Sequence, residues 1–197
     1  MDKPIFVEKY IGEVKEYCNA LDFNSVESLV DELALLRENK GRLFILGMGG
    51  SAANASHAAT DLRKLCSIEA YAPVDNVSEI TANVNDFGIE FIFTKSLQAS
   101  NMNSRDSLFV FSVGGGDEIR KISTGLIHSV RYAKTLGSKV YSIVGREDSY
   151  VAKNSNLSII LQIKNSERVT PHSETLQSMI WHLLSCHPKL QISGTTW

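Results

Sequence analysis

The pattern of apolar residues changes at Arg42, and this change constrains the fold more than any other feature of the sequence. From there onward, short apolar runs alternate with segments of helical periodicity. That order is typical of a parallel sheet whose strands are buried on both faces by crossover helices. We therefore predict an α/β fold, a three-layer α/β/α sandwich. Its five parallel strands are expected at residues 42–46, 69–74, 107–113, 139–145 and 157–163, and its helices near 52–65, 76–84, 89–101, 117–136 and 172–186, with a short turn at 151–154.

Two amphipathic helices are expected before the first strand. Residues 5–21 place apolar side chains at helical spacing, and a second helix begins at Asn24 or Ser25, where a serine can cap it. A length of 197 residues with 43% hydrophobic content suits one buried core. We expect a single domain, 1–197, made of the N-terminal helices (1–40) and a parallel α/β core (41–190).

Composition narrows the possible partners and the compartment. The 20 basic and 22 acidic residues give a net charge of −2 without a basic cluster, so neither nucleic acid nor an anionic membrane is an expected partner. Three widely separated cysteines form no C-x-x-C pair, which favours a reducing cytoplasm. The charged N-terminus and the lack of about 18 consecutive apolar residues predict neither a signal peptide nor a membrane span.

Two glycine turns follow expected strands. These are "GMGGS" at 47–51 and "SVGGGDE" at 112–118. In open parallel sheets, ligands bind beyond the carboxyl ends of the strands where the strand order reverses. Glycine lets the backbone approach a ligand, and N–H groups at a helix start suit a phosphate, although a purely structural corner is an alternative. Nucleotide binding is the weaker interpretation, because neither G-x-G-x-x-G nor a Walker loop is present. Asp117 is either a helix cap or a substrate contact.

Polar residues on two expected helices offer metal ligands. His57 and Asp61 are four residues apart and share a helix face, although an ordinary surface pair has the same spacing. The last helix adds Glu174 and His182, with His172 as a substitute ligand. Because eight helical residues span about 12 Å, Glu174 and His182 reach one ion only if Glu174 extends from the first turn or if subunits share the site. His128 is assigned to a surface or packing role, and His187, which Pro188 follows, to a structural role as the terminator of the last helix.

Several of these segments together resemble the sugar isomerase (SIS) domain family, which has a flavodoxin-like fold. The segments are the G-x-G-G-S turn, "SHAATDL", "NDFG", the serine-glycine turn and "ETLQSMIWHLL". Within that family the chain is similar to the phosphoheptose isomerases over nearly its whole length. This resemblance implies a ketose-aldose isomerase that converts sedoheptulose 7-phosphate to D-glycero-D-manno-heptose 7-phosphate through an enediol. It also implies zinc or another divalent metal, and a homotetramer with active sites between subunits and the N-terminal helices in its core.

The resemblance also assigns roles by position. It implies Asp61 and His182 as catalytic residues, and a metal held by His57, Asp61, Glu174 and His182. The implied substrate-binding residues are Gly49, Gly50, Ser51, Asn85, Asp86, Ser112, Gly114, Asp117 and Glu174.

The chain departs from the family pattern at four places. Asp61 replaces a glutamate, Glu174 a glutamine, Met48 an asparagine, and "SVGGGDE" a serine-rich phosphate loop. The amides of Gly114 to Gly116 can still form an anion nest. These departures keep open a second hypothesis, a non-catalytic SIS adaptor or regulator that binds protein partners, with sugar phosphate as effector.

Overall fold

A computed structural model describes residues 5–194. The sheet contains β1 (Arg42–Leu46), β2 (Glu69–Tyr71), β3 (Ser107–Ser112), β4 (Lys139–Val144) and β5 (Leu157–Ile160). All neighbours are parallel, in the order β2-β1-β3-β4-β5, which confirms the predicted sheet. The chain leaves β1 for β2 on one side and then returns to β3 on the other. The order therefore reverses between β1 and β3, and a glycine turn follows each of these two strands.

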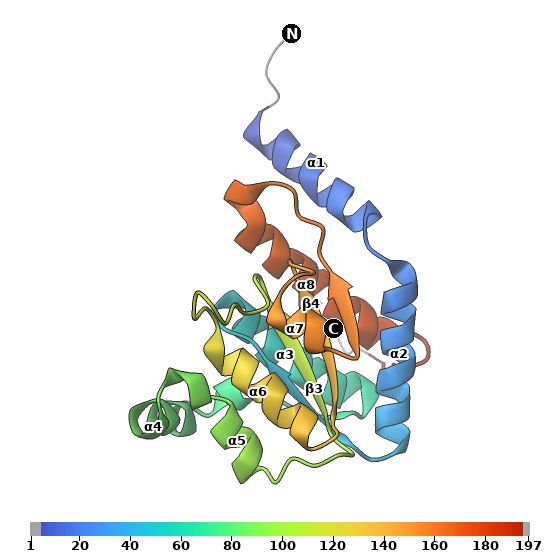
Figure 1. Ribbon diagram of the computed structural model, residues 1–197. Helices are drawn as coiled ribbons and strands as arrows, with labels where there is room; N and C mark the ends of the chain where they lie inside the picture. The colour runs from blue at the N-terminus through green and yellow to red at the C-terminus, as the bar shows by residue number, and fades with distance from the viewer. Residues whose placement is uncertain (1–4, 195–197) are drawn as a thin grey trace.

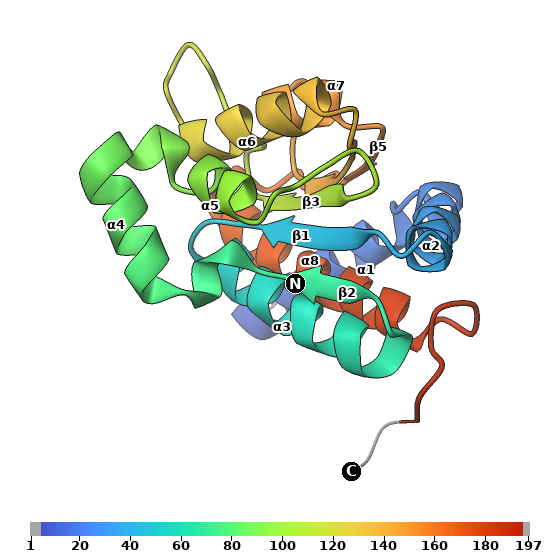
Figure 2. The same ribbon diagram turned by 90° about the horizontal axis from the view of Figure 1, so that it is seen from below.

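Helices cover both faces of the sheet (Figures 1 and 2). On one face, α2 (Phe23–Glu38), α3 (Gly50–Cys66) and α8 (Val169–Cys186) share a core with inward side chains such as Ile45 and Phe109. On the other, α5 (Thr94–Ala99), α6 (Thr124–Thr135) and α7 (Tyr150–Asn154) pack against alternate strand residues, for example Phe44 and Val110. This alternation follows from the two-residue period of a strand. The first helix, α1 (Phe6–Asn19), lies near the start of α8 in Figure 1.

Several element boundaries differ from the sequence-based prediction. The helix expected from 117 begins only at Thr124, because Asp117 and Ile122 exchange both backbone hydrogen bonds (3.0 Å each) and close a turn. Asp117 therefore does not cap α6; its Oδ1 accepts the N–H groups of Ile119 and Arg120 instead. The segment between β3 and α6 stands out as a loop in Figure 2.

Other boundaries shift by a few residues. Strand β2 ends at Tyr71, shortly before Pro73, which lacks the N–H needed to extend a ladder. Helix α8 begins at Val169, three residues earlier than expected. Helix α4 (Val77–Phe87) extends far enough to include Asn85 and Asp86 in its last turn. One-turn 3-10 helices occupy Pro73–Asp75, Ile89–Phe91 and Ser166–Arg168.

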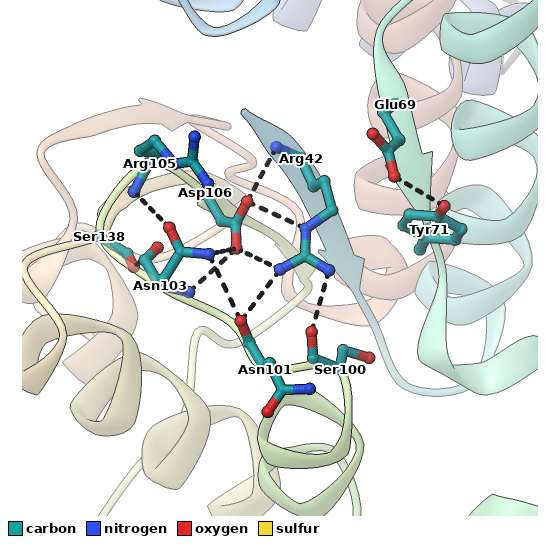
Figure 3. Close-up of polar contacts among 9 residues, drawn as sticks. All are labelled: Arg42, Glu69, Tyr71, Ser100, Asn101, Asn103, Arg105, Asp106 and Ser138. Atoms are coloured by element: carbon teal, nitrogen blue, oxygen red, sulfur yellow. Dashed lines mark hydrogen bonds and ion pairs between the residues drawn. The ribbon is translucent and has the colours of Figure 1, made fainter. Parts of the chain in front are cut away.

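A buried ion pair joins β1 to the loop before β3 (Figure 3). The Arg42 guanidinium donates to both carboxylate oxygens of Asp106 (Nε to Oδ1, 3.1 Å; NH2 to Oδ2, 2.7 Å). It also donates to the carbonyl oxygens of Ser100 and Asn101. Burial opposes ionisation of Asp106, but the hydrogen bonds from Arg42 and from the Asn103 N–H, together with the charge of Arg42, outweigh it and lower the pKa of this carboxyl. These contacts help to hold β1 and β3 side by side, and a glycine turn follows each of these two strands.

No helix within residues 5–194 is both long and apolar enough to cross a membrane.

Candidate active site

The first glycine turn leads directly into α3. Gly49 precedes the helix with φ of 62°, in the left-handed region that glycine adopts at little cost. Helix α3 begins at Gly50, so Ser51 lies in its first turn, and the Ser51 hydroxyl donates to Gln177 Oε1 on α8 (2.9 Å). This buried hydrogen bond joins α3 to α8.

Three of the four expected metal ligands converge. The ligand atoms of His57, Asp61 and His182 all lie within 4.8 Å of one another. His57 and Asp61 come from successive turns of α3, with His57 Nε2 3.8 Å from Asp61 Oδ2, and His182 comes from α8. The cluster opens to solvent, since 60% of the His57 side chain and 21% of the Asp61 side chain are exposed. Two imidazoles and a carboxylate are donors that suit zinc and related divalent ions.

Hydrogen bonding fixes the tautomer of His182. Its Nδ1 lies 2.7 Å from the carbonyl oxygen of Ser178. A carbonyl oxygen only accepts, so Nδ1 carries the proton and Nε2 keeps its lone pair. The Trp181 ring stacks on this imidazole with a centroid distance of 3.5 Å, and it also lies 4.5 Å from the His57 ring. His182 thus offers one oriented nitrogen to a metal or to a substrate.

Glu174 lies elsewhere, beside the first glycine turn. Its carboxylate packs so closely on Gly50 that a Cβ at residue 50 would clash with Glu174 Oε2. Within residues 5–194 the structure does not bring Glu174 into the cluster of His57, Asp61 and His182. It places a carboxylate near the amino end of α3, where the helix dipole favours negative charge.

His172 is not a ligand within this chain. Its side chain is fully buried, and Nε2 lies 2.8 Å from Glu13 Oε2 on α1. Glu13 also accepts hydrogen bonds from Arg168 and Asn165, so four residues join α1 to the start of α8. Glu13 shares a helix face of α1 with Tyr10 and Tyr17, and the rings of both tyrosines pack against the His172 ring.

The second glycine turn is rigidly held. The Ser112 hydroxyl accepts the N–H of Gly115 (3.0 Å), and Gly115 and Gly116 have φ of 66° and 79°. The N–H groups of Tyr150 and Val151 on α7 donate to the carbonyl oxygens of these two glycines. A Cβ at Gly114 would meet nothing within 4 Å, so the backbone is open to a ligand there.

Asn85 and Asp86 contact one another at the end of α4, where Asn85 Nδ2 donates to Asp86 Oδ1 (2.8 Å). Within residues 5–194 neither makes a hydrogen bond or an ion pair with the cluster of three. His128 packs edge-on against Phe91, in agreement with its expected surface or packing role. His187 directly follows α8, as expected of a helix terminator, and pairs with Glu27.

Residues 9–145 match the family model described as SIS domain. The chain belongs to the SIS domain family. It is 29% identical over 165 residues to a phosphoheptose isomerase of Helicobacter pylori (strain P12), covering 81% of this chain and 78% of that protein. It is 25% identical over 189 residues to a phosphoheptose isomerase of Syntrophotalea carbinolica, covering 91% and 90%.

Solved SIS structures have the same fold. A phosphoheptose isomerase from Neisseria gonorrhoeae has a TM-score of 0.78 at 21% identity, with 91% of this chain and 95% of that chain covered. One from Francisella tularensis has a TM-score of 0.76 at 25% identity, with 91% and 92% covered. The resemblance to the SIS family and its fold, predicted from short motifs, is therefore confirmed.

Proposed function

We propose that this SIS domain is a sugar-phosphate isomerase that interconverts a ketose and an aldose phosphate. The proposed substrate pair is sedoheptulose 7-phosphate and D-glycero-D-manno-heptose 7-phosphate. The observation that carries the proposal is the convergence of His57, Asp61 and His182 from two helices that flank the first glycine turn. Similarity to proteins named phosphoheptose isomerase supports the choice of reaction and substrate.

The chemistry needs a base at carbon and an acid at oxygen. A ketose becomes an aldose when a proton leaves C1, an enediol forms, and a proton returns to C2. Asp61 is the proposed base, since a half-buried carboxylate at the edge of the site can take the C1 proton and return it to C2. His182 is the proposed partner for the sugar oxygens, through the Nε2 that its contact with Ser178 leaves available.

His57, Asp61 and His182 also fit a divalent metal, and zinc is the proposed ion. When bound, such an ion polarises the carbonyl and stabilises negative charge on the enediol oxygens. His182 has one available nitrogen, so it either binds the metal or exchanges a proton at any one moment. Asp61 has two carboxylate oxygens and can serve in both roles.

The rest of the proposed site lies at the carboxyl edge of the sheet. Gly49, Gly50 and Ser51 form the first turn, and Ser112, Gly114 and Asp117 form the second, where backbone amides would receive the phosphate. Asn85, Asp86 and Glu174 are proposed substrate contacts, and Glu174 is a proposed metal ligand only if another subunit completes the site. We extend the proposal to a cytoplasmic homotetramer assembled through residues 1–40.

The test is turnover of sedoheptulose 7-phosphate by the purified protein, with the aldose product detected by NMR. Wild-type protein should interconvert the two sugars. Turnover of the same protein is measured in parallel after removal of zinc and after its restoration. Asp61→Asn and His182→Ala should each lower kcat by about 10² to 10⁴-fold, the range that a positioned acid or base contributes. His128→Ala is the matched control and should retain turnover.

The adaptor hypothesis predicts a different pattern. A regulator would bind sugar phosphate without converting it, and His182→Ala would keep its binding partners. Wild-type protein that holds zinc and binds the ketose phosphate, yet forms no aldose phosphate, would refute the isomerase proposal.

A further inference from the structure

A partly buried polar network joins the two helices that carry the cluster. Asn54 on α3 donates from Nδ2 to the carbonyl oxygen of Glu174 (3.0 Å) and, more weakly, to Gln177 Oε1 (3.4 Å). Its Oδ1 accepts the indole N–H of Trp181 (3.1 Å). Asn54 therefore contacts α8 at three positions spread over two turns, residues 174, 177 and 181, on the side of α8 that faces α3.

The orientation of this network follows from the indole. A Trp N–H can only donate, so the carbonyl end of Asn54 must face Trp181 and its amide end must face Glu174 and Gln177. That orientation turns Oε1 of Gln177 toward Asn54 and Ser51. Gln177 Nε2 is left as one of the few buried polar atoms in residues 5–194 that lack a partner. Three contacts between α3 and α8 thus depend on the side-chain amide of Asn54.

The network leads directly to the candidate active site. His57 lies one turn beyond Asn54 on α3, and His182 follows Trp181 on α8. The indole that Asn54 holds stacks on the His182 ring and packs against the His57 ring. Trp181 is 1% exposed, so its ring has little freedom to adopt another orientation while the bond to Asn54 remains.

We infer that Asn54 is a positioning residue for the candidate active site. Its amide holds α8 in register with α3 and orients Trp181, which sets the spacing of the His57 and His182 imidazoles. The inference rests on the proposed function for the location of the site, but the contacts that carry it involve neither substrate nor metal.

The test follows the ring of His182 by NMR in full-length protein with labelled histidines. Stacking on Trp181 should shift the His182 ring protons upfield in the wild type, and His182→Gln assigns them. Asn54→Leu should remove much of that shift. Asn54→Asp should retain more of it than Asn54→Leu, because one carboxylate oxygen still accepts the indole N–H and Gln177 can reverse its amide to donate, although the other oxygen now faces the Glu174 carbonyl oxygen.

A second readout is affinity for Co²⁺, followed by its visible absorption. Asn54→Leu should weaken Co²⁺ binding by about 10- to 100-fold, as loss of a group that orients metal ligands does. Asn83→Leu is the matched control: Asn83 is an asparagine buried more deeply than Asn54, and it also donates two hydrogen bonds, to the Ile92 carbonyl oxygen and Ser96 Oγ, yet it lies on α4. It should lower stability while leaving the His182 resonances in place.

The outcomes separate this inference from the proposed function. If Asn54→Leu does not fold, Trp181→Phe provides a second test. It removes the indole N–H that donates to Asn54 Oδ1, and it should also weaken Co²⁺ binding. Wild-type His182 shifts and Co²⁺ affinity in the folded variant would overturn the inference. If the wild type binds no Co²⁺, the His182 shifts alone decide. Absence of isomerase turnover in the wild type would refute the proposed function and leave this comparison intact.

Discussion

At the scale of single residues, the candidate site depends on how closely α8 approaches the first glycine turn. Gly50 has no side chain, and the Glu174 carboxylate occupies the space that a Cβ would fill. The backbone of Gly50 has ordinary helical geometry, since it is absent from the residues with positive φ. Its glycine is therefore required by the neighbouring carboxylate and not by backbone conformation.

Gly50→Ala should consequently preserve the fold and displace Glu174. The clash of the added Cβ with the Glu174 carboxylate forces the carboxylate to move, and a displacement of about 1 Å costs up to about 10²-fold in rate. The measurement is kcat/KM of the folded variant. Gly12→Ala is the control, because a Cβ there meets nothing within 4 Å and alanine favours a helix. Equal activity of Gly50→Ala and wild type would show that Glu174 has no part in the reaction.

At the scale of secondary-structure elements, the ion pair of Arg42 and Asp106 predicts where the sheet is vulnerable. Arg42→Met leaves the Asp106 carboxylate, whose side chain is 3% exposed, without its cation. Removal of one partner from a buried pair costs about 3 kcal/mol or more of unfolding free energy. Urea denaturation measures this loss. Arg146→Met removes an exposed pair with Asp148 and should leave the denaturation midpoint nearly unchanged.

The junction of α1 with α8 should depend on pH. Hydrogen bonds from Arg168 and then His172 hold the pKa of Glu13 far below its ordinary value. A carboxyl with a lowered pKa in the folded state contributes stability above its unfolded pKa of 4.5, and that stability is lost as pH falls below it.

Glu13→Gln should therefore lower Tm at pH 7 and remove part of the decline of Tm between about pH 4.5 and 2. Thermal unfolding followed by circular dichroism checks both effects. Glu16→Gln, on the same helix, alters an exposed pair with Lys164 and should change Tm much less. A parallel decline of Tm with pH in Glu13→Gln and wild type would contradict this account.

Periodicity predicted the elements well but not every boundary. The five apolar runs identified all strands, because a buried parallel strand needs an apolar run of that length. The predicted start of α6 was wrong, because the backbone hydrogen bonds between Asp117 and Ile122 close a turn and the helix begins only at Thr124. Helical spacing brought His57 and Asp61 together, whereas the contacts of His172 with Glu13 and of Asn54 with Trp181 join residues more than 100 positions apart. Single-sequence periodicity contains no information about such pairs.

At the scale of the whole molecule, α1 presents apolar side chains to solvent. Val7 and Ile11 are 63% and 47% exposed, although Glu13 holds the helix in place through its contacts with Arg168 and His172. A fixed helix with an exposed apolar face is typical of an interface between subunits. It supports the proposed assembly through residues 1–40.

Replacing Val7 and Ile11 by glutamate tests that assembly. The two residues are one turn apart on α1, so the double variant places two like charges at the centre of the proposed interface. We expect it to shift the wild-type oligomer toward smaller species by size-exclusion chromatography with light scattering, and to lower turnover if subunits share the site. Lys9→Glu also adds negative charge to α1, but it leaves Val7 and Ile11 in place and should retain the oligomer. An unchanged mass for Val7→Glu/Ile11→Glu would place the interface elsewhere, and a changed mass with full turnover would show that one chain holds the complete site.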